Sequence, residues 1–589
     1  MSIPNKNKID FLLLGRVLKT AKPYKGLFIW TLILAVVLAP VATIRPYLVQ
    51  TMVDDYIFKN DLGGLYWMGV LFIGVLILSG ILRYLFIYSS SLLGQNVIKD
   101  LRVRVFSHIT SLRLTFFDNT PIGTSTTRTI NDIETINSVF TQGVMTIIAD
   151  LFTLFFVFAL MMYSSWQLTL VCLTTIPFMI GASYVFKESV KKSYQKVRKQ
   201  ISKMNAFLQE RISGMRIIQI FNAEEQELKK FGEINRAYTQ ANLNAIFAYA
   251  VFYPVVEIIS ATSLGLMVWW GARGVISSEI SLGVLVAFPI YLSMLFRPIR
   301  MLADKFNTLQ MGLVAAERVF TLLDTEDKIK DTGTIKAKDL DGHIRFDDVS
   351  FSYVLGQKVL KNVSFELKKG ETMAIVGSTG SGKSTIINIL NRFYPLTEGK
   401  ITIDDVEIRD YELESLRSRI ALVLQDVFLF SGSVIQNITL MDEEITREEV
   451  IDAAKTIGAH EFIMRLPGGY DFEVMERGAT LSMGQRQLIS FVRALVVDPD
   501  ILILDEATSS IDPETESVIQ HAIETLIEKR TSIIIAHRLS TIKHANQIMV
   551  LSQGEIMERG THKELLRNQD GHYRQLYEMQ FASTQKAAG

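Results

Sequence analysis

Apolar runs that are long enough to cross a lipid bilayer dominate the first half of this sequence. After about residue 330 they give way to short strand-like runs, glycine turns and charged helices. A helix needs about 20 apolar residues to cross the hydrocarbon core, where every backbone polar group must be bonded internally. The first half is therefore predicted to be a helical membrane domain with six spans, at approximately 27–48, 66–88, 143–163, 167–186, 246–270 and 280–302.

Composition agrees with a chain of two parts. At 589 residues the chain is too long for one ordinary core. A mean hydropathy of +0.24 beside 21% charged residues indicates an apolar part joined to a soluble part. The formal charges balance, which removes net charge as an argument for binding nucleic acid. Cys172 is the one cysteine; it excludes an internal disulfide framework, and its apolar neighbours favour a packing role over a reactive thiol.

Lysine and arginine fix the expected orientation. They are abundant between about residues 187 and 245 and again around residues 99–104, whereas the loop Val53–Tyr56 is acidic. The positive-inside rule then places both termini and these two long loops in the cytoplasm. The loops keep a helical pattern, so the spans are predicted to continue as helices beyond the bilayer. A short turn at Ser164–Trp166 makes the third and fourth spans a hairpin, and the basic N-terminal segment is no cleavable signal peptide.

A glycine-rich motif of phosphate-binding type opens the soluble half. Two alternating strands are predicted at His343–Val349 and Leu360–Leu367, and the apolar strand Thr372–Val376 runs directly into the motif. The pattern G-x-x-x-x-G-K-S between a strand and a helix is typical of a phosphate loop, in which amides and a lysine hold phosphates. The alternative is a plain glycine-rich turn. The motif residues are Gly377, Ser378, Thr379, Gly380, Ser381, Gly382, Lys383, Ser384 and Thr385.

Two further apolar strands end in residues with catalytic chemistry. Ile501–Leu504 ends in Asp505 and Glu506, and Thr531–Ala536 ends at His537. The carboxyl ends of parallel strands share one edge of a sheet, where ligands bind. We therefore expect Asp505 to hold Mg²⁺, Glu506 to act as general base on water, and His537 to contact the γ-phosphate. The alternatives are an ordinary solvated strand end and a structural histidine.

A helix start of distinctive composition lies at Ala479–Leu488, with the sequence ATLSMGQRQL. Ser482 and Gln485 have the spacing of a capping box, in which each side chain bonds the other residue's amide. Free amides at a helix start also attract phosphate. The segment is thus predicted to bind a phosphate, provided that the side chain of Met483 points away.

These residues resemble the motifs of ABC transporters in the family's order. The soluble half is similar to the nucleotide-binding domain of that family over its whole length, and the six spans resemble the fused membrane domain of ABC exporters of the multidrug or lipid flippase kind. The resemblance assigns Walker A to 377–385 and Walker B to 501–506. It assigns the adenine-stacking residue to Tyr353, for which a core tyrosine is the alternative, and the Q-loop to Gln425. The signature motif is Leu481, Ser482, Met483, Gly484 and Gln485, and the D-loop is Ser509, Ser510, Ile511 and Asp512, with His537 as the switch histidine.

The resemblance implies ATP and Mg²⁺ as cofactors, with Ser384, Gln425 and Asp505 around the metal. It also implies a dimer, because in this family the signature of one chain caps the ATP held by the Walker A motif of the other. The family's usual third signature residue is glycine, and here it is Met483. Phosphate recognition needs the hydroxyl of Ser482, backbone amides and close approach at Gly484, so the site is predicted to be competent. The chain is therefore expected to be a half-transporter, as a homodimer or as one half of a heterodimer.

The expected organisation is a membrane domain at 1–315, a linker at 316–342 and a nucleotide-binding domain at 343–589. Two segments of the membrane half, Thr115–Asp118 with Gly123 and Ser213–Phe221, resemble the family's intracellular loops. In relatives these loops carry coupling helices that dock on the nucleotide-binding domains, the second on the partner chain's domain. The alternative is an amphipathic surface helix.

The expected function is ATP-driven export or flipping of a hydrophobic or amphipathic drug or lipid across a bilayer, the plasma membrane of a bacterium. A gated or regulatory protein without pumping is the alternative class, and an importer of the same fold is possible. Charges inside spans, Asp150 and Glu257 above all, are costly in a membrane. They form either an acidic patch for cationic substrates or ion pairs between helices. No nucleic acid partner is expected.

Overall fold

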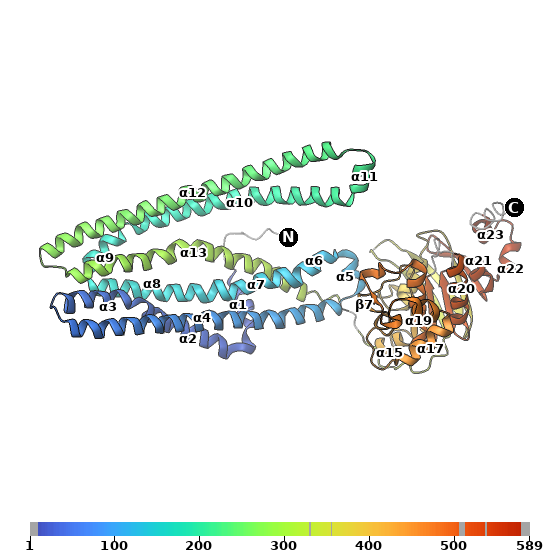
Figure 1. Cartoon of the computed structure of the whole chain (residues 1–589). Helices are drawn as coiled ribbons and strands as arrows, with labels where there is room; N and C mark the ends of the chain where they lie inside the picture. The colour runs from blue at the N-terminus through green and yellow to red at the C-terminus, as the bar shows by residue number, and fades with distance from the viewer. Residues whose placement is uncertain (1–9, 329–330, 355, 506–512, 536–538, 579–589) are drawn as a thin grey trace. The chain divides into compact units, whose positions relative to one another are not determined.

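The computed structural model describes residues 10–328, 331–354, 356–505, 513–535 and 539–578. The chain divides into two compact units (Figure 1). The first consists of Met1–Ser111 and Thr120–Glu326, and the second of Leu112–Asn119 and Asp327–Gly589. Thr115–Asp118 of the predicted first intracellular loop thus belongs to the second unit, and Gly123 of the same predicted loop belongs to the first.

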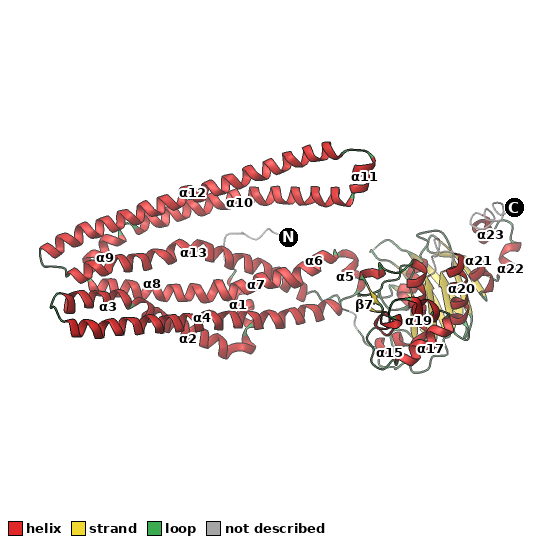
Figure 2. Ribbon diagram, in the orientation of Figure 1, coloured by secondary structure: helices red, strands yellow, loops and turns green. Residues whose placement is uncertain are grey.

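The first unit is helical throughout its described residues (Figure 2). Long helices are joined by short turns and by π-helical segments. The helices are α1 (Phe11–Thr20), α2 (Lys25–Thr43), α3 (Arg45–Thr51), α4 (Leu62–Thr110), α6 (Ile122–Thr127), α7 (Ile133–Ser138), α8 (Met145–Ser164), α9 (Trp166–Leu173), α10 (Ile176–Ser213), α11 (Met215–Ile220), α12 (Glu224–Ile276) and α13 (Leu282–Leu323). The π-helical segments are η2 (Met52–Ile57), η3 (Arg128–Asp132) and η4 (Val139–Val144).

Within the described residues, five helical stretches are long and apolar enough to cross a membrane: Lys22–Ile57, Leu62–Thr110, Ile122–Ser164, Trp166–Ser213 and Glu224–Ile276. A sixth apolar stretch, Leu282–Pro298, is shorter, so six spans stay a prediction. The 49 residues of α4 rise about 74 Å, far more than the roughly 30 Å of a hydrocarbon core. The helices therefore do continue beyond the bilayer thickness, as the sequence predicts.

The fourth span is broken, although the sequence predicts one apolar run. The chain leaves α8 at Ser165, which is extended (φ −162°, ψ 110°) and caps α9 by accepting the amide of Leu168. This confirms the predicted hairpin turn. A second break at Thr174 and Thr175 separates α9 from α10. Pro177 lies in the first turn of α10 and has no amide to donate into the preceding turn, which accounts for the break.

The acidic segment Val53–Tyr56 is a helix and not the loop that its sequence suggests. It lies within η2. Asp54 accepts hydrogen bonds from the Ser281 hydroxyl at 2.6 Å and from the Gly283 amide at 2.7 Å. This carboxylate thus satisfies an otherwise unpaired donor at the start of α13. The partner is 229 positions away in the sequence, and local pattern carries no information about it.

The charged residues inside the spans differ in their surroundings. Asp150 on α8 accepts a hydrogen bond from Lys305 on α13, and both side chains are largely buried. This supports the ion-pair interpretation for Asp150. Glu257 on α12 is exposed, and no cation of the described chain lies within ion-pair distance of it. The acidic-patch hypothesis for Glu257 stays a prediction.

The second unit is built on β-sheets, shown in yellow in Figure 2. In its described residues one sheet has the strand order β2-β1-β4-β5, another has the order β12-β11-β3-β10-β9-β6, and β7 pairs with β8. The strands are β1 (Ile344–Phe351), β2 (Leu360–Leu367), β3 (Thr372–Val376), β4 (Glu398–Ile403), β5 (Val406–Glu407), β6 (Ile420–Val423), β7 (Gly432–Ser433), β8 (Glu473–Val474), β9 (Ile501–Asp505), β10 (Thr531–Ile535), β11 (Gln547–Ser552) and β12 (Glu555–Gly560).

Helices cover the sheets of the second unit. They are α5 (Leu114–Asn119), α14 (Lys383–Leu390), α15 (Leu413–Ser418), α16 (Val434–Thr439), α17 (Arg447–Ile457), α18 (His460–Arg465), α19 (Met483–Val496), α20 (Pro513–Ile527), α21 (Leu539–His544), α22 (His562–Arg567) and α23 (His572–Tyr577). Alternate strand residues pack into two cores, because successive side chains point to opposite faces. Leu502 and Leu504 of β9 join one core, and Ile501 and Ile503 join the other.

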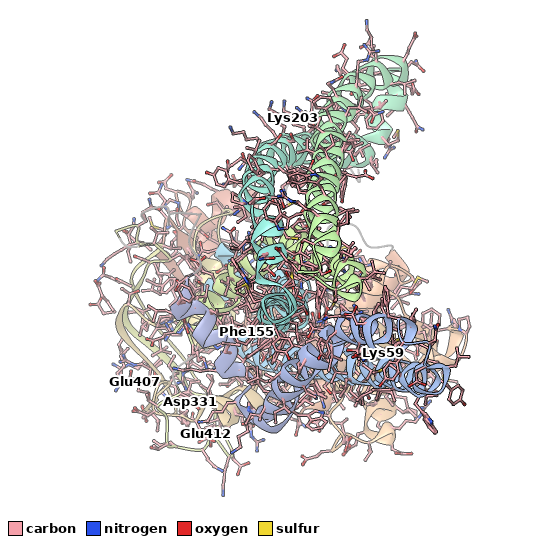
Figure 3. The ribbon with its side chains drawn as sticks, turned by 90° about the vertical axis from the view of Figure 1, so that its left-hand side faces the viewer. Lys59, Phe155, Lys203, Asp331, Glu407 and Glu412 are labelled. Carbon is pink, nitrogen blue, oxygen red and sulfur yellow. The ribbon has the colours of Figure 1, made fainter. Side chains whose placement is uncertain are left out.

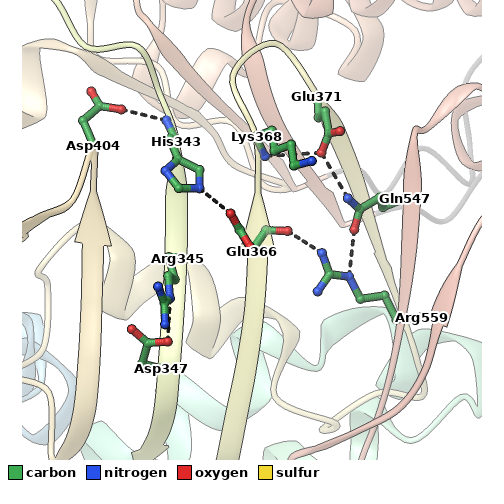
Figure 4. A network of polar contacts seen from close by, with 9 residues as sticks. All are labelled: His343, Arg345, Asp347, Glu366, Lys368, Glu371, Asp404, Gln547 and Arg559. Atoms are coloured by element: carbon green, nitrogen blue, oxygen red, sulfur yellow. Dashed lines mark hydrogen bonds and ion pairs between the residues drawn. The ribbon is translucent and has the colours of Figure 1, made fainter.

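A polar network joins the two larger sheets (Figure 4). His343 contacts Glu366 at 2.8 Å, and this hydrogen bond lowers the pKa of the glutamate. Arg559 donates to Gln547 at 2.7 Å, and Gln547 donates to Glu371 at 3.0 Å. Arg559 also donates to the carbonyl oxygen of Glu366, and this contact links β2 to β12. These contacts fix the edge of the parallel sheet next to β3, the strand that leads into the phosphate-loop motif.

Candidate functional site

The phosphate-loop motif connects β3 to α14, as predicted. Gly380 and Gly382 have φ angles of 82° and 107°, which residues with a side chain rarely adopt. A Cβ atom at Gly382 would lie 2.7 Å from the Leu360 side chain, and one at Gly377 would lie 2.1 Å from the carbonyl oxygen of Leu551. The loop therefore needs glycine at these positions, for its conformation and for its close packing on neighbouring strands.

Lys383 is folded over this loop. Its ammonium donates to the carbonyl oxygens of Gly377 at 2.9 Å and Ser378 at 3.0 Å. The residue is only 9% exposed; burial lowers the pKa of the ammonium, and the charge of Asp505 partly opposes this effect. The hydroxyl of Ser381 is buried without a partner among the described residues. A buried cation and an unsatisfied hydroxyl in one loop fit an anionic ligand that accepts hydrogen bonds.

The parallel sheet brings the predicted residues to one edge. β10 lies between β3 and β9, and Ile535 is in register with Ile375 on one side and with Asp505 on the other. β6 pairs in parallel with β9, and Gln425 follows β6 and is exposed. The carboxyl ends of these strands therefore meet beside the phosphate loop, which is the usual ligand edge of such sheets.

Not every predicted residue can be placed. Thr379 is exposed on the loop. Ser384 and Thr385 lie in the first turn of α14, where Ser384 is exposed and Thr385 is buried. Asp505 is the last residue of β9. The predicted general base, switch histidine and D-loop lie outside the described residues; these are Glu506, His537, Ser509, Ser510, Ile511 and Asp512. Their roles stay predictions.

Tyr353 lies next to the phosphate-loop helix. Its hydroxyl donates to Thr385 at 3.3 Å and accepts from Asn388 at 3.1 Å, and its ring meets that of Tyr394 edge to face at 5.0 Å. The side chain is 43% exposed, so the tyrosine is not a plain core residue. The ring also meets that of Phe351 edge to face at 4.8 Å.

The helix start at Ser482 has the predicted capping box. The Ser482 hydroxyl accepts the Gln485 amide at 3.2 Å, and the Gln485 side chain accepts the Ser482 amide at 3.0 Å. Leu481 and Gly484 are buried, whereas Ser482 is exposed. Met483 is 38% exposed, so its side chain is not locked into the core. The capping box uses the amide of Gln485, and it leaves the amides of Met483 and Gly484 in the first helical turn beside the exposed hydroxyl.

One contact of the site region is not predicted by the sequence. Asp118 on α5 accepts a hydrogen bond from the hydroxyl of Tyr394, and its burial and this carboxylate raise the pKa of the tyrosine. Arg113 also pairs with Asp327 at 3.5 Å. Tyr394 in turn packs on Tyr353, which lies beside the phosphate-loop helix. Tyr394 therefore connects α5 to Tyr353. Asp118 and Tyr394 lie 276 positions apart, and no local pattern could have identified the pair.

Comparison with known proteins agrees with this geometry. Residues 28–299 match the family model of the ABC transporter transmembrane region, and residues 360–509 match that of the ABC transporter. YknV of Bacillus subtilis (strain 168), named an uncharacterized ABC transporter ATP-binding protein, is 40% identical; the match covers 94% of this chain and 92% of that protein. A second protein of that organism, named "Probable multidrug resistance ABC transporter ATP-binding/permease protein YheH", is 38% identical over 91% of this chain and 80% of its own.

A third relative is named for a different activity. The ATP-dependent lipid A-core flippase of Desulfotalea psychrophila is 36% identical, and the match covers 95% of this chain and 97% of that protein. The chain therefore belongs to the ABC transporter family. It is an ATP-hydrolysing membrane transporter of the half-transporter kind, because one transmembrane region and one ATPase domain lie on the same chain.

Proposed function

We propose that this chain pairs with a second copy and uses ATP hydrolysis to export or flip hydrophobic or amphipathic compounds, drugs or lipids. The observation that carries the proposal is the sheet edge at which the phosphate loop, Asp505 and Gln425 meet, on a chain that also has bilayer-spanning helices. The names of the relatives, a multidrug transporter and a lipid A flippase, support the substrate class. Exposed aromatic residues of α8, such as Phe155 at 65% (Figure 3), suit an apolar cargo or surrounding lipid equally.

The residues of the phosphate loop fit magnesium ATP. When bound, the nucleotide supplies the phosphoanhydride bond whose hydrolysis drives transport. Lys383 would exchange its two carbonyl partners for the outer phosphates, and the unsatisfied Ser381 hydroxyl would gain an acceptor. Ser384, Gln425 and Asp505 would hold the metal with hydroxyl, amide and carboxylate oxygens, which are the ligands that Mg²⁺ prefers. Tyr353 would stack on the adenine ring.

The first helical turn after Ser482 would cap a nucleotide held by the partner chain. Its hydroxyl and amides are placed as an anion site requires, and the half-transporter supplies each motif once. In a homodimer both composite sites would then be complete. A heterodimer with a second half-transporter remains the alternative, favoured by the departure at Met483. The orientation that the lysines predict places the ATPase domain in the cytoplasm and the helices in a bacterial plasma membrane.

Replacing Ser482 by Ala is expected to lower ATP hydrolysis about 10²-fold, the usual cost of one lost donor to a developing charge. The helix cap would also weaken, by about 1 kcal/mol. Met483→Gly is the matched variant next to it and is expected to keep wild-type turnover, because the methionine contributes its amide only. Phosphate release by the purified chain in nanodiscs measures both. Full activity of Ser482→Ala, or loss of activity in Met483→Gly, would contradict the proposed role.

Asp118→Ala is expected to separate hydrolysis from transport. The variant removes the carboxylate that accepts from Tyr394, and a hydrogen bond to a charged group contributes about 1.5–3 kcal/mol. We expect ATP hydrolysis to stay near wild type, whereas transport per ATP falls about tenfold or more. Asn119→Ala is the control, because among the described residues that side chain donates to the Thr115 carbonyl within α5 and to no part of the sheets. Equal transport by both variants would contradict a coupling role for α5.

Transport itself tests the substrate class. Proteoliposomes that contain the chain are given a fluorescent phospholipid or a hydrophobic dye, and ATP-dependent movement across the bilayer is followed. We expect movement that stops without ATP. Hydrolysis without movement of any lipid or apolar dye would favour the gated or regulatory class instead. The leaflet that loses the probe gives the direction of transport, and this direction distinguishes an exporter from an importer.

A further inference from the structure

A band of cations lies on the exposed side of α10, away from α12, directly after the apolar part of the helix. The band, called here the basic collar, lies where the sequence places the end of the fourth span. All its side chains are exposed. Its members are Lys187, Lys191, Lys192, Lys196, Arg198 and Lys199. Lys187 and Lys199 are 12 positions apart, so the collar extends about 18 Å along the helix axis. One acidic residue, Glu188, lies between them in the sequence.

The neighbouring helix does not neutralise the collar. α12 runs beside α10 (Figure 1), with Phe186 stacked on Phe252 at 3.9 Å and Val197 packed with Ala241. These contacts place residues 241–252 of α12 at the level of the collar, and the sequence has no acidic residue between Glu233 and Glu257. For Lys187, Lys192, Lys196, Arg198 and Lys199, no carboxylate of the described chain lies within 4.0 Å of the side-chain nitrogens.

The far end of the same helix pair is organised differently. There Arg211 pairs with Glu227 at 2.6 Å and with Glu210 at 2.9 Å, and Lys230 pairs with Glu227 at 3.0 Å. The two cations lower the pKa of Glu227 by their hydrogen bonds. At this end of the helix pair, the chain therefore supplies counter-charges of its own. At the other end, the described ion pairs include none for Lys187, Lys192 and Lys196 of the collar.

Exposed apolar side chains mark the level of the membrane surface. Tyr184 and Val185, directly before the collar, are 67% and 69% exposed, and Phe247 on α12 is 69% exposed. Such side chains are stable in contact with lipid, and aromatic residues favour the boundary of the bilayer. Cations directly beyond them lie at the depth of the headgroups, within reach of their flexible stems.

We propose that the basic collar binds anionic phospholipid headgroups of the leaflet on the ATPase-domain side. Clusters of four to eight basic residues next to a span attract anionic lipid by about 1 kcal/mol for each residue at the surface. A zwitterionic headgroup carries its own cation and gains little. The exposed apolar residues at the same level favour a lipid over a soluble acidic partner. The inference goes beyond the proposed export function and does not depend on the transported substrate.

The test compares lipid binding by four forms of the full chain. The purified chain in detergent is titrated with phosphatidylglycerol and, separately, with phosphatidylcholine, and native mass spectrometry counts the lipids bound. The collar variant is Lys187→Gln, Lys192→Gln and Lys196→Gln. The tip variant, with the same change in charge, is Lys203→Gln, Lys229→Gln and Lys230→Gln; Lys203 points away from the helix pair (Figure 3). A fourth form carries Arg at the three collar positions.

The wild type is expected to bind phosphatidylglycerol more tightly than phosphatidylcholine. Each collar lysine removed should lower the affinity for phosphatidylglycerol about fivefold, so that the collar variant loses on the order of 100-fold. The tip variant should stay within about twofold, and the Arg form should bind like the wild type, which also shows that the positions tolerate substitution. ATP hydrolysis by the collar variant verifies its fold.

Three results would overturn the inference. Unchanged phosphatidylglycerol binding by the collar variant would exclude the collar as the site. An equal loss of phosphatidylglycerol affinity in the tip variant would mean that the overall charge of the chain, and not the collar, determines lipid binding. Carbodiimide cross-linking of collar lysines to carboxylates of a second copy, in a bilayer that contains phosphatidylglycerol, would mean that a protein surface covers the collar.

Discussion

Glu506→Gln is expected to lower the rate of ATP hydrolysis about 10²- to 10⁴-fold, because the amide cannot take a proton from the attacking water. ATP binding should be unchanged, since the phosphate loop and Tyr353 are intact. The dimer should therefore accumulate with ATP trapped between its domains. Phosphate release and retention of labelled ATP, measured on the same preparation in nanodiscs, separate the two effects.

A matched glutamate distinguishes this loss from a general effect of charge. Glu528 lies on the surface after α20, and Glu528→Gln makes the same chemical change away from the sheet edge. We expect wild-type hydrolysis from it. Full-rate hydrolysis by Glu506→Gln would disprove the assignment of the general base, and a second carboxylate would have to take its place.

Lys383→Met is the second variant with a large expected effect. It removes the buried cation that the phosphate loop holds at 2.9 and 3.0 Å from two carbonyl oxygens. Loss of a charge that stabilises the transferring phosphoryl group should lower hydrolysis about 10²- to 10³-fold. In contrast to Glu506→Gln, ATP affinity should also fall, because the same ammonium holds the ground-state phosphates. The fold should survive, since methionine matches the length of the lysine stem and burying a cation is costly.

Lys369→Met is the control for the second variant. Lys369 is an exposed lysine near the same strand and pairs with Asp341 on the surface, a kind of pair that contributes little. Hydrolysis and ATP binding should both stay at wild-type levels. A Lys383→Met protein that binds ATP with unchanged affinity would contradict the assigned role of the loop.

The parts of the site that are local in sequence are those that could be predicted. Strand β3 begins and ends at the predicted residues Thr372 and Val376, because an apolar run before a glycine motif determines both the strand and its end. The capping box at Ser482 is equally local, since its two partners are three residues apart. The parallel sheet then follows from the order of apolar strands and helices.

The contacts that bridge distant segments could not be predicted. Asp54 lies in a segment with the composition of a loop, yet the segment is helical and the carboxylate bonds the start of α13. The break before α10 follows from Pro177 within an apolar run, where hydropathy alone gives no boundary. Asp118 and Tyr394 meet because a short helix of the membrane half folds with the second unit. Each of these depends on packing across more than 100 positions or on one missing amide.

ATP hydrolysis by this chain alone, reconstituted in lipid nanodiscs without any other half-transporter, tests the central claim most directly. The account predicts robust turnover, which requires that Ser482 and Met483 of one copy complete the nucleotide site of the other. If the pure chain binds ATP but does not hydrolyse it, the account is contradicted. A second half-transporter would then have to supply the residues that complete the nucleotide site.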